Sequence, residues 1–219
     1  MSEAVPLVSF LGDTALLLEA PGATSLEAQR RIWALAREAQ TWPEIAEAVP
    51  GMNNLMLTVH QPLPSPAGVI RRLQEAWPAV VPLALAGRVV ELPVTYGGEG
   101  GPHMADVLAH TGLDVDEVVA RHAAPDYPVY AIGSHPGYCY LGGMDPRIAT
   151  PRRHSPVLRL PGGSVSIGGQ QTGVSASDGP SGWNTIGSTT MCFFDPSLPQ
   201  PCLLSPGDTI RFRVARVIR

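Results

Sequence analysis

Residues 133–147 have the sequence GSHPGYCYLGGMDPR, and this stretch decides the fold of the second half of the chain. Glycine and proline recur every few residues from here to the C-terminus, and no helical periodicity follows. Short strand-like runs lie between them, for example at 157–160, 164–167, 185–187 and 209–214. Many short strands separated by such turns are typical of a β-barrel or a β-sandwich, so we expect one of these after residue 133.

The first 90 residues predict a compact α+β unit. Apolar runs flank the turn signal Gly12-Asp13, and Ser25 is a good N-cap for a helix with apolar residues at helical spacing. The expected elements are strands at 5–10 and 15–19, a helix at 26–39, strands at 45–49 and 54–60, a helix at 66–77 and a strand at 88–94. This order predicts a ferredoxin-like layout, with two helices on one face of a sheet.

Residues 82–87 form a short linker, after which the pattern changes. A helix is expected from Gly101-Pro102 to the stop signal Thr111-Gly112. A second helix is expected at 115–122, with Asp114 and Glu117 as its capping box, and a strand at 127–132. We therefore predict an α+β protein with an α+β domain at 1–86 and a β-barrel domain at 87–219.

The composition excludes several classes of protein. Of the 219 residues, 44% are hydrophobic and 16% charged, so the chain can bury a core. A net charge of −4 gives no electrostatic reason to bind nucleic acid or an anionic membrane. No apolar run approaches the roughly 20 residues that span a bilayer. Residues 1–10 contain Glu3 and no basic residue, unlike a signal peptide, so we expect a cytoplasmic protein.

All fifteen basic residues are arginine, and the chain contains no lysine. This excludes a P-loop, a Schiff-base lysine and a biotin attachment site. Groups for ATP or biotin chemistry must therefore come from a partner, or arginine must replace the lysine. The three cysteines have no CxxC spacing, the six histidines show no metal-ligand spacing, and no GxSxG motif occurs, so we expect no metal site.

The stretch at 133–147 resembles a signature of the allophanate hydrolase subunit 1 family. Further matches in the expected order are Leu11–Ala15, Val49–Asn54, Tyr96–Gly98, Gly101-Pro102, Thr150–Arg153, Gly163–Val165, Gln171–Gly173, Gly182-Trp183, Ile186-Gly187, Phe194–Pro196 and Pro206–Asp208. Within the family, these motifs are most similar to those of the B subunits of 5-oxoprolinase. The chain departs from the family pattern at His103, Ser134, Tyr138, Cys139, Val157, Gly162 and Ser181.

The resemblance implies a cyclophilin-like β-barrel after the ferredoxin-like domain. It also implies an allophanate hydrolase subunit 2-like partner (the C subunit of 5-oxoprolinase) and a third protein, the A subunit of 5-oxoprolinase. Together these open 5-oxo-L-proline to L-glutamate with ATP, which we expect to bind within the complex, so that this chain supplies half of an active site. The family leaves two alternatives, the carboxyltransferase half of a urea or amide carboxylase and a binding module that inhibits a histidine kinase.

A site for a lactam with a carboxylate needs a cation, hydrogen-bond donors for the carbonyl oxygen and a flat apolar wall. Arg152 and Arg153 can offer a guanidinium fork, although one of them can instead pair with a nearby acid. Gln171 and Thr172 lie in a glycine-flanked stretch that is either an open ligand loop or a tight turn. These four residues are candidates for binding the substrate.

The apolar wall has aromatic candidates in Tyr138, Tyr140 and Trp183, each of which can equally belong to the core. Trp183 has the best claim, because the preceding residues 178–182 have the composition of a flexible loop. For acid–base catalysis the candidates are His122 and His135, since histidine titrates nearest neutrality. His122 ends a predicted helix, where the macrodipole favours its charged form, and this is also a purely structural explanation.

Overall fold

The computed structural model describes residues 5–62 and 65–219, and the chain divides into two compact units, residues 1–85 and 86–219. Each unit has a hydrophobic core of its own. Among the described residues, no helix combines the length and the apolar character needed to cross a membrane.

The first unit is a four-stranded antiparallel sheet with two helices. Its elements are β1 (Leu7–Leu11), β2 (Ala15–Glu19), α1 (Leu26–Ala39), β3 (Ile45–Pro50), β4 (Asn54–Val59) and α2 (Ala67–Ala79). The strand order is β1-β2-β4-β3. Alternate residues of the two central strands are buried, as the two-residue period of a strand requires, and they pack against the apolar faces of the helices.

The predicted ferredoxin-like layout assigns one strand to the wrong unit. The strand expected at 88–94 is β5 (Val89–Gly97), and it belongs to the sheet of the second unit. It pairs there in parallel with a strand more than a hundred residues further along the chain, starting at Thr209 opposite Val89. Local periodicity identifies a strand but carries no information about a partner so distant in sequence.

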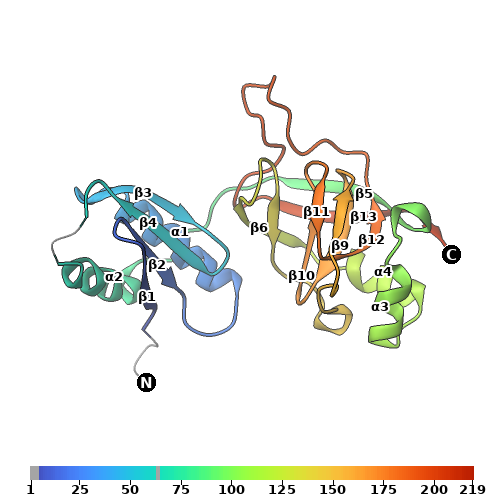
Figure 1. Cartoon of the computed structure of the whole chain (residues 1–219), viewed down its shortest axis with the longest axis horizontal. Coiled ribbons are helices and arrows are strands. Elements are labelled where there is room, and N and C mark those ends of the chain that lie inside the picture. The colour runs from blue at the N-terminus through green and yellow to red at the C-terminus, as the bar shows by residue number, and fades with distance from the viewer. Residues whose placement is uncertain (1–4, 63–64) are drawn as a thin grey trace. The chain divides into compact units, whose positions relative to one another are not determined.

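The second unit is built around a nearly closed, barrel-like sheet with few helices (Figure 1). Its remaining elements are η1 (Gly98–Gly100), α3 (Met104–Thr111), α4 (Val115–Ala123), β6 (Tyr127–Ile132), β7 (Cys139–Leu141), η2 (Pro146–Ile148), β8 (Val157–Leu160), β9 (Ser164–Gly168), β10 (Gln171–Val174), β11 (Gly179–Ser181), β12 (Asn184–Ser188) and β13 (Thr209–Ile218). This confirms a mixed helix and sheet protein whose second half is barrel-like.

The large sheet has the strand order β10-β9-β12-β5-β13-β6-β7. The two end strands, β7 and β10, lie against each other, so the sheet curls almost into a closed barrel. Strands β8 and β11 form a separate two-stranded antiparallel sheet. The expectation that residues 178–182 are a loop is therefore wrong, because β11 occupies most of them.

Candidate active site

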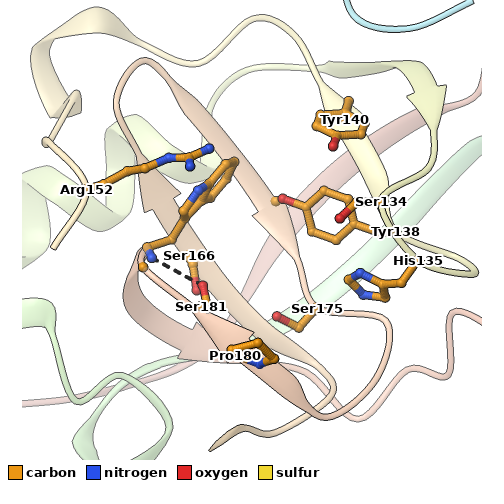
Figure 2. A pocket seen from close by; sticks show the side chains of 12 residues that line it. Ser134, His135, Tyr138, Tyr140, Arg152, Ser166, Ser175, Pro180 and Ser181 are labelled. Carbon is orange, nitrogen blue, oxygen red and sulfur yellow. Dashed lines mark hydrogen bonds between the residues drawn. The ribbon is translucent and has the colours of Figure 1, made fainter. Parts of the chain in front are cut away.

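A cavity of about 240 Å³ opens in the barrel unit beside Trp183, and we call it the Trp183 cavity (Figure 2). Its walls come from β7 and the segment before it, from the segment after η2, and from β9, β10, β11 and the residues that flank β11. The lining residues are Ser134, His135, Tyr138, Tyr140, Arg152, Ser166, Gly173, Ser175, Pro180, Ser181, Gly182 and Trp183. The structure thus brings together five of the candidate residues, His135, Tyr138, Tyr140, Arg152 and Trp183.

Aromatic rings form one part of the cavity wall. The ring centroids of Tyr138 and Trp183 lie 6.4 Å apart, and the two ring planes are nearly perpendicular. Glycine is required beneath both rings, because a Cβ at Gly168 would lie 2.5 Å from the Trp183 ring and one at Gly173 would lie 2.9 Å from the Tyr138 hydroxyl. The two rings thus form an aromatic corner of the cavity, which two glycines of neighbouring strands shape.

Arg152 supplies the positive charge at the cavity. Its guanidinium carbon lies 5.7 Å from the centre of the Trp183 ring, within the range of a cation–π contact. Within residues 5–62 and 65–219 it has no ion-pair partner, and its side chain is exposed. Figure 2 shows it on one side of the cavity, with Tyr138, Tyr140 and His135 on the other. A planar anion between them would contact a cation at one end and aromatic rings at the other.

His135 and several hydroxyl groups supply the remaining polar atoms. The His135 ring lies 5.0 Å from the Tyr138 ring, and its Nε2 atom is buried without a hydrogen-bond partner in the described structure. Burial is the main cause that raises the pKa of Tyr138, and the nearby Tyr140 raises it further. Tyr138 is therefore a neutral hydroxyl at pH 7. Ser134 and Ser175 also line the cavity. These groups can donate hydrogen bonds to a carbonyl oxygen.

Three of the predicted binding residues lie outside this cavity. Arg153 forms an ion pair with Asp106 and faces a neighbouring groove. Thr172 is 1% exposed, and its Oγ1 lies 2.7 Å from His122 Nε2 in the core. Gln171 is half-buried at the start of β10 and does not line the cavity. The stretch at 168–173 is thus a tight turn between two paired strands rather than an open loop.

His122 lies wholly inside the barrel core. Its Nδ1 is 2.8 Å from the Tyr96 hydroxyl, and its ring centroid is 4.5 Å from that of Phe212. Burial lowers the pKa of His122 from 6.5 to about 3, so the ring is neutral at pH 7. The expectation that the helix dipole favours a charged His122 is therefore wrong, because the loss of hydration outweighs the dipole.

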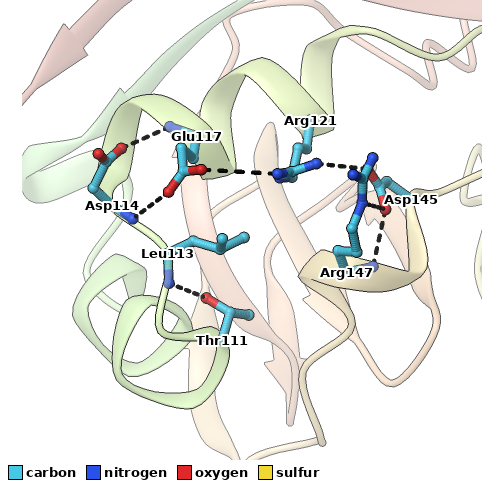
Figure 3. Close-up of polar contacts among 7 residues, drawn as sticks. All are labelled: Thr111, Leu113, Asp114, Glu117, Arg121, Asp145 and Arg147. Atoms are coloured by element: carbon cyan, nitrogen blue, oxygen red, sulfur yellow. Dashed lines mark hydrogen bonds and ion pairs between the residues drawn. The ribbon is translucent and has the colours of Figure 1, made fainter.

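The end of the signature stretch has a structural role. Asp145 caps η2, since its Oδ1 accepts a hydrogen bond from the Arg147 backbone at 2.9 Å, and hydrogen bonds from Arg147 lower the pKa of the carboxyl. Arg121 of α4 lies 3.6 Å from Asp145 and 3.8 Å from Glu117 (Figure 3). This chain of charges joins α4 to the segment that follows β7, and none of its members lines the Trp183 cavity.

Sequence reasoning missed the serines of the cavity. Ser166 of β9 is 4% exposed, and its Oγ donates to Thr185 Oγ1 at 3.1 Å. Ser181 accepts a hydrogen bond from the Trp183 backbone at 3.2 Å. Polar residues within the expected barrel strands were a possible signal for these serines. Which side of the sheet their side chains face depends on the strand register, which the sequence does not show. Among the described residues, no group of three or more His, Cys, Asp or Glu side chains could hold a metal ion.

A family model described as the carboxyltransferase domain, subdomain C and D, matches residues 6–204. The barrel-like unit and the matched range together define the chain as a carboxyltransferase-type domain. Two relatives have a more specific name. The 5-oxoprolinase B subunit of Escherichia coli O157:H7 is 44% identical over 92% of this chain and 93% of its own length. That of Haemophilus influenzae is 38% identical over 93% of this chain and 95% of its own. The chain belongs to the family of these 5-oxoprolinase B subunits.

Solved structures agree with this fold. A protein named TTHA0988 is 34% identical with a TM-score of 0.74, and the match covers 92% of this chain and 40% of that one. The urea carboxylase of Kluyveromyces lactis is 16% identical with a TM-score of 0.76, and the match covers 98% of this chain and 22% of that one. This chain therefore spans less than half of either protein, and the second likeness concerns the fold alone.

Proposed function

We propose that this chain is a component of an ATP-dependent 5-oxoprolinase, in which its Trp183 cavity binds 5-oxo-L-proline. In this proposal it works with the C subunit of 5-oxoprolinase, a protein of the allophanate hydrolase subunit 2 type, and with the A subunit to form L-glutamate. The observation that carries the proposal is the cation of Arg152 beside the Trp183 ring, at the mouth of a cavity of about 240 Å³. The names of the relatives support the same substrate.

The lining residues take separate roles in this proposal. Arg152 pairs with the substrate carboxylate, because an ionised donor and acceptor make the strongest hydrogen bonds. The rings of Trp183 and Tyr138 hold the flat lactam. His135 exchanges a proton with the amide, since its Nε2 has no other partner in the described structure. The hydroxyls of Ser134 and Ser175 donate to the carbonyl oxygen.

The ATP of the proposed reaction has no lysine to bind to in this chain, because all basic residues are arginine. We therefore propose that ATP binds within the assembled complex, and that the opening of the ring amide requires groups from the partner proteins. ATP hydrolysis would supply the free energy for opening a stable lactam. The residues of this chain act on the amide by binding and orienting it and by moving a proton.

The test is co-expression of the chain with its two proposed partners, followed by measurement of glutamate formation and of ATP hydrolysis that depends on 5-oxoproline. We expect both in the complex and neither in the isolated chain. The substitution His135→Gln should lower kcat by about a hundredfold or more, as expected for loss of an acid–base group. A purified complex without 5-oxoproline-dependent ATP hydrolysis would refute the proposal.

The second candidate is a carboxyl-transfer component acting on urea or another amide. The description of the matching family model as a carboxyltransferase domain favours it. Biotin attachment needs a lysine, which these 219 residues lack, so the biotin carrier would have to lie outside them. Bicarbonate-dependent ATP consumption by a reconstituted mixture with such proteins, stimulated by urea and not by 5-oxoproline, would favour this candidate over the first.

A further inference from the structure

A second hollow, of about 430 Å³, lies next to the Trp183 cavity on the barrel unit. We call it the Arg153 groove. It is open, and α3, the segment after η2 and the start of β12 contribute to it. Its polar side chains include Asp106, His110, Arg152, Arg153, His154 and Ser155. Arg152 lines both hollows, so the groove and the Trp183 cavity meet at this side chain.

The lining of the groove is predominantly cationic. Arg152 and Arg153 keep their charge at any physiological pH, because guanidinium does not deprotonate in proteins. Asp106 is the one carboxylate among the described lining residues, and its ion pair with Arg153 offsets a single charge. Arg152 has no ion-pair partner in the part of the chain that the structure describes. The groove therefore has a net positive charge before either histidine is counted.

Arg153 is held in place by a backbone hydrogen bond, but one of its side-chain donors has no acceptor. Its backbone N–H donates to the Gly182 carbonyl at 2.7 Å, which fixes the residue beside the cavity. Its Nε atom is buried and has no hydrogen-bond partner in the described structure. A buried donor without a partner costs free energy, and such a donor in a native protein needs an explanation. Because this atom is buried, only a shift of the side chain would bring it to an acceptor, which an anion in the groove would provide.

We infer that the Arg153 groove binds a phosphate group, as a second subsite beside the Trp183 cavity. A tetrahedral phosphate has more acceptor oxygens than a carboxylate, and two guanidinium groups with adjacent imidazole and hydroxyl donors match it. In a chain without lysine, arginine is the side chain that always carries a full positive charge at neutral pH. The inference rests on the proposed function, because the amide in the cavity and the phosphate in the groove would share Arg152.

The experiment is isothermal titration of the full chain with inorganic phosphate, and then with ATP, in low-salt buffer. Arg153→Gln removes one of the two guanidinium charges of the groove and should weaken phosphate binding about tenfold, the effect of losing a charged hydrogen bond. Asp106→Asn removes the competing carboxylate and should tighten binding about threefold. Since misfolding cannot tighten binding, the second variant separates a damaged fold from a lost site.

Arg159→Gln is the matched control. Arg159 is also a surface arginine, paired with Asp178 at 3.1 Å, and it lies outside the groove. Its replacement should leave phosphate affinity within about twofold of the wild type. Equal losses in Arg153→Gln and Arg159→Gln, or no phosphate binding by the wild type, would overturn the inference.

Two further comparisons are needed. One distinguishes a nucleotide from free phosphate as the ligand of the groove, and the other distinguishes failure of the groove proposal from failure of the proposed function. If ATP binds more tightly than inorganic phosphate and loses affinity in Arg153→Gln, the group belongs to a nucleotide. If inorganic phosphate alone follows the predicted order of variants, the groove holds free phosphate. Titration with 5-oxoproline tests the cavity separately. If 5-oxoproline does not bind but phosphate binds normally, the proposed function is contradicted. If 5-oxoproline binds but phosphate does not, only the inference about the groove is overturned.

Discussion

Arg152 lies between two hollows of the barrel unit and is shared by both. The neighbouring residue Arg153 differs from it in its surroundings, because Arg153 is paired with Asp106 whereas Arg152 contacts the face of Trp183. Two consecutive arginines thus have different environments. Both side chains line the Arg153 groove, but only Arg152 also reaches the Trp183 cavity.

The substitution Arg152→Gln should raise the KM of the assembled enzyme for 5-oxoproline by about tenfold to a hundredfold, because a charged hydrogen bond to the carboxylate is lost. The value of kcat should change much less, since the lost contact is to a part of the substrate that does not react. Steady-state kinetics with the Arg159→Gln variant as control provide the measurement. An unchanged KM would contradict the assignment of Arg152 to the carboxylate.

His122 should make stability depend on pH. Its pKa in the folded protein is about 3, below its ordinary value of 6.5, because it is buried. Between these values the unfolded chain binds a proton that the folded chain does not, so the free energy of unfolding falls as the pH decreases from 6.5, by about 1.4 kcal/mol per pH unit.

Denaturant unfolding at several pH values below 6.5 measures this slope. The variant His122→Gln keeps polar atoms near Tyr96 and Thr172 but cannot titrate, so its slope should be smaller than that of the wild type. The variant His154→Gln, which alters an exposed histidine, should keep the wild-type slope. Identical slopes in all three proteins would show that His122 does not contribute.

At the level of elements, α4 connects the core of the barrel unit to its surface. It carries His122 on the buried face and Arg121 toward Asp145. The predicted capping box is confirmed, because Asp114 Oδ1 accepts from the Glu117 N–H at 2.8 Å and Glu117 Oε2 accepts from the Asp114 N–H at 3.3 Å (Figure 3). The helix is short, so its start matters to its stability.

The substitution Asp114→Ala should lower the free energy of unfolding by about 1 kcal/mol, the usual cost of losing a side-chain N-cap. Thermal and denaturant unfolding measure the change. Binding of 5-oxoproline should be unaffected, since no residue of α4 lines the Trp183 cavity. A loss of binding without a loss of stability would contradict this separation between the helix and the site.

At the scale of the whole molecule, the barrel unit contains every residue that lines the Trp183 cavity and the Arg153 groove. It also has a core independent of the first unit. A unit with its own core and its own site should fold alone. The first unit supplies a separate sheet with an exposed edge strand, β1, on which Leu7 and Phe10 are exposed.

A fragment of residues 86–219 should therefore fold cooperatively and bind 5-oxoproline with an affinity within about threefold of the full chain. Circular dichroism and ligand titration provide the measurements, with the Arg152→Gln fragment as the control that should bind about tenfold to a hundredfold more weakly. A folded fragment without affinity for 5-oxoproline, beside a full chain that binds it, would show that the first unit contributes to the site.

The sequence by itself determined most of the local structure. Alternating apolar residues, the N-caps Ser25 and Asp114, and the turns at glycine and proline depend on neighbours within a few residues, so a pattern can identify them. The helix Leu26–Ala39 and the strand Val157–Leu160 have the predicted bounds. The motifs also sufficed to identify the family, because their order along the chain needs no knowledge of contacts.

Tertiary structure decided which of these pieces meet. Parallel pairing of β5 with β13, and the closing of β10 against β7, join residues far apart in sequence, and no local pattern specifies such a pair. Register then decided that Thr172 faces His122 in the core, whereas Arg152 and Trp183 meet at a cavity. A strand shifted by one residue exchanges its two faces, so the direction of each side chain is a property of the assembled sheet.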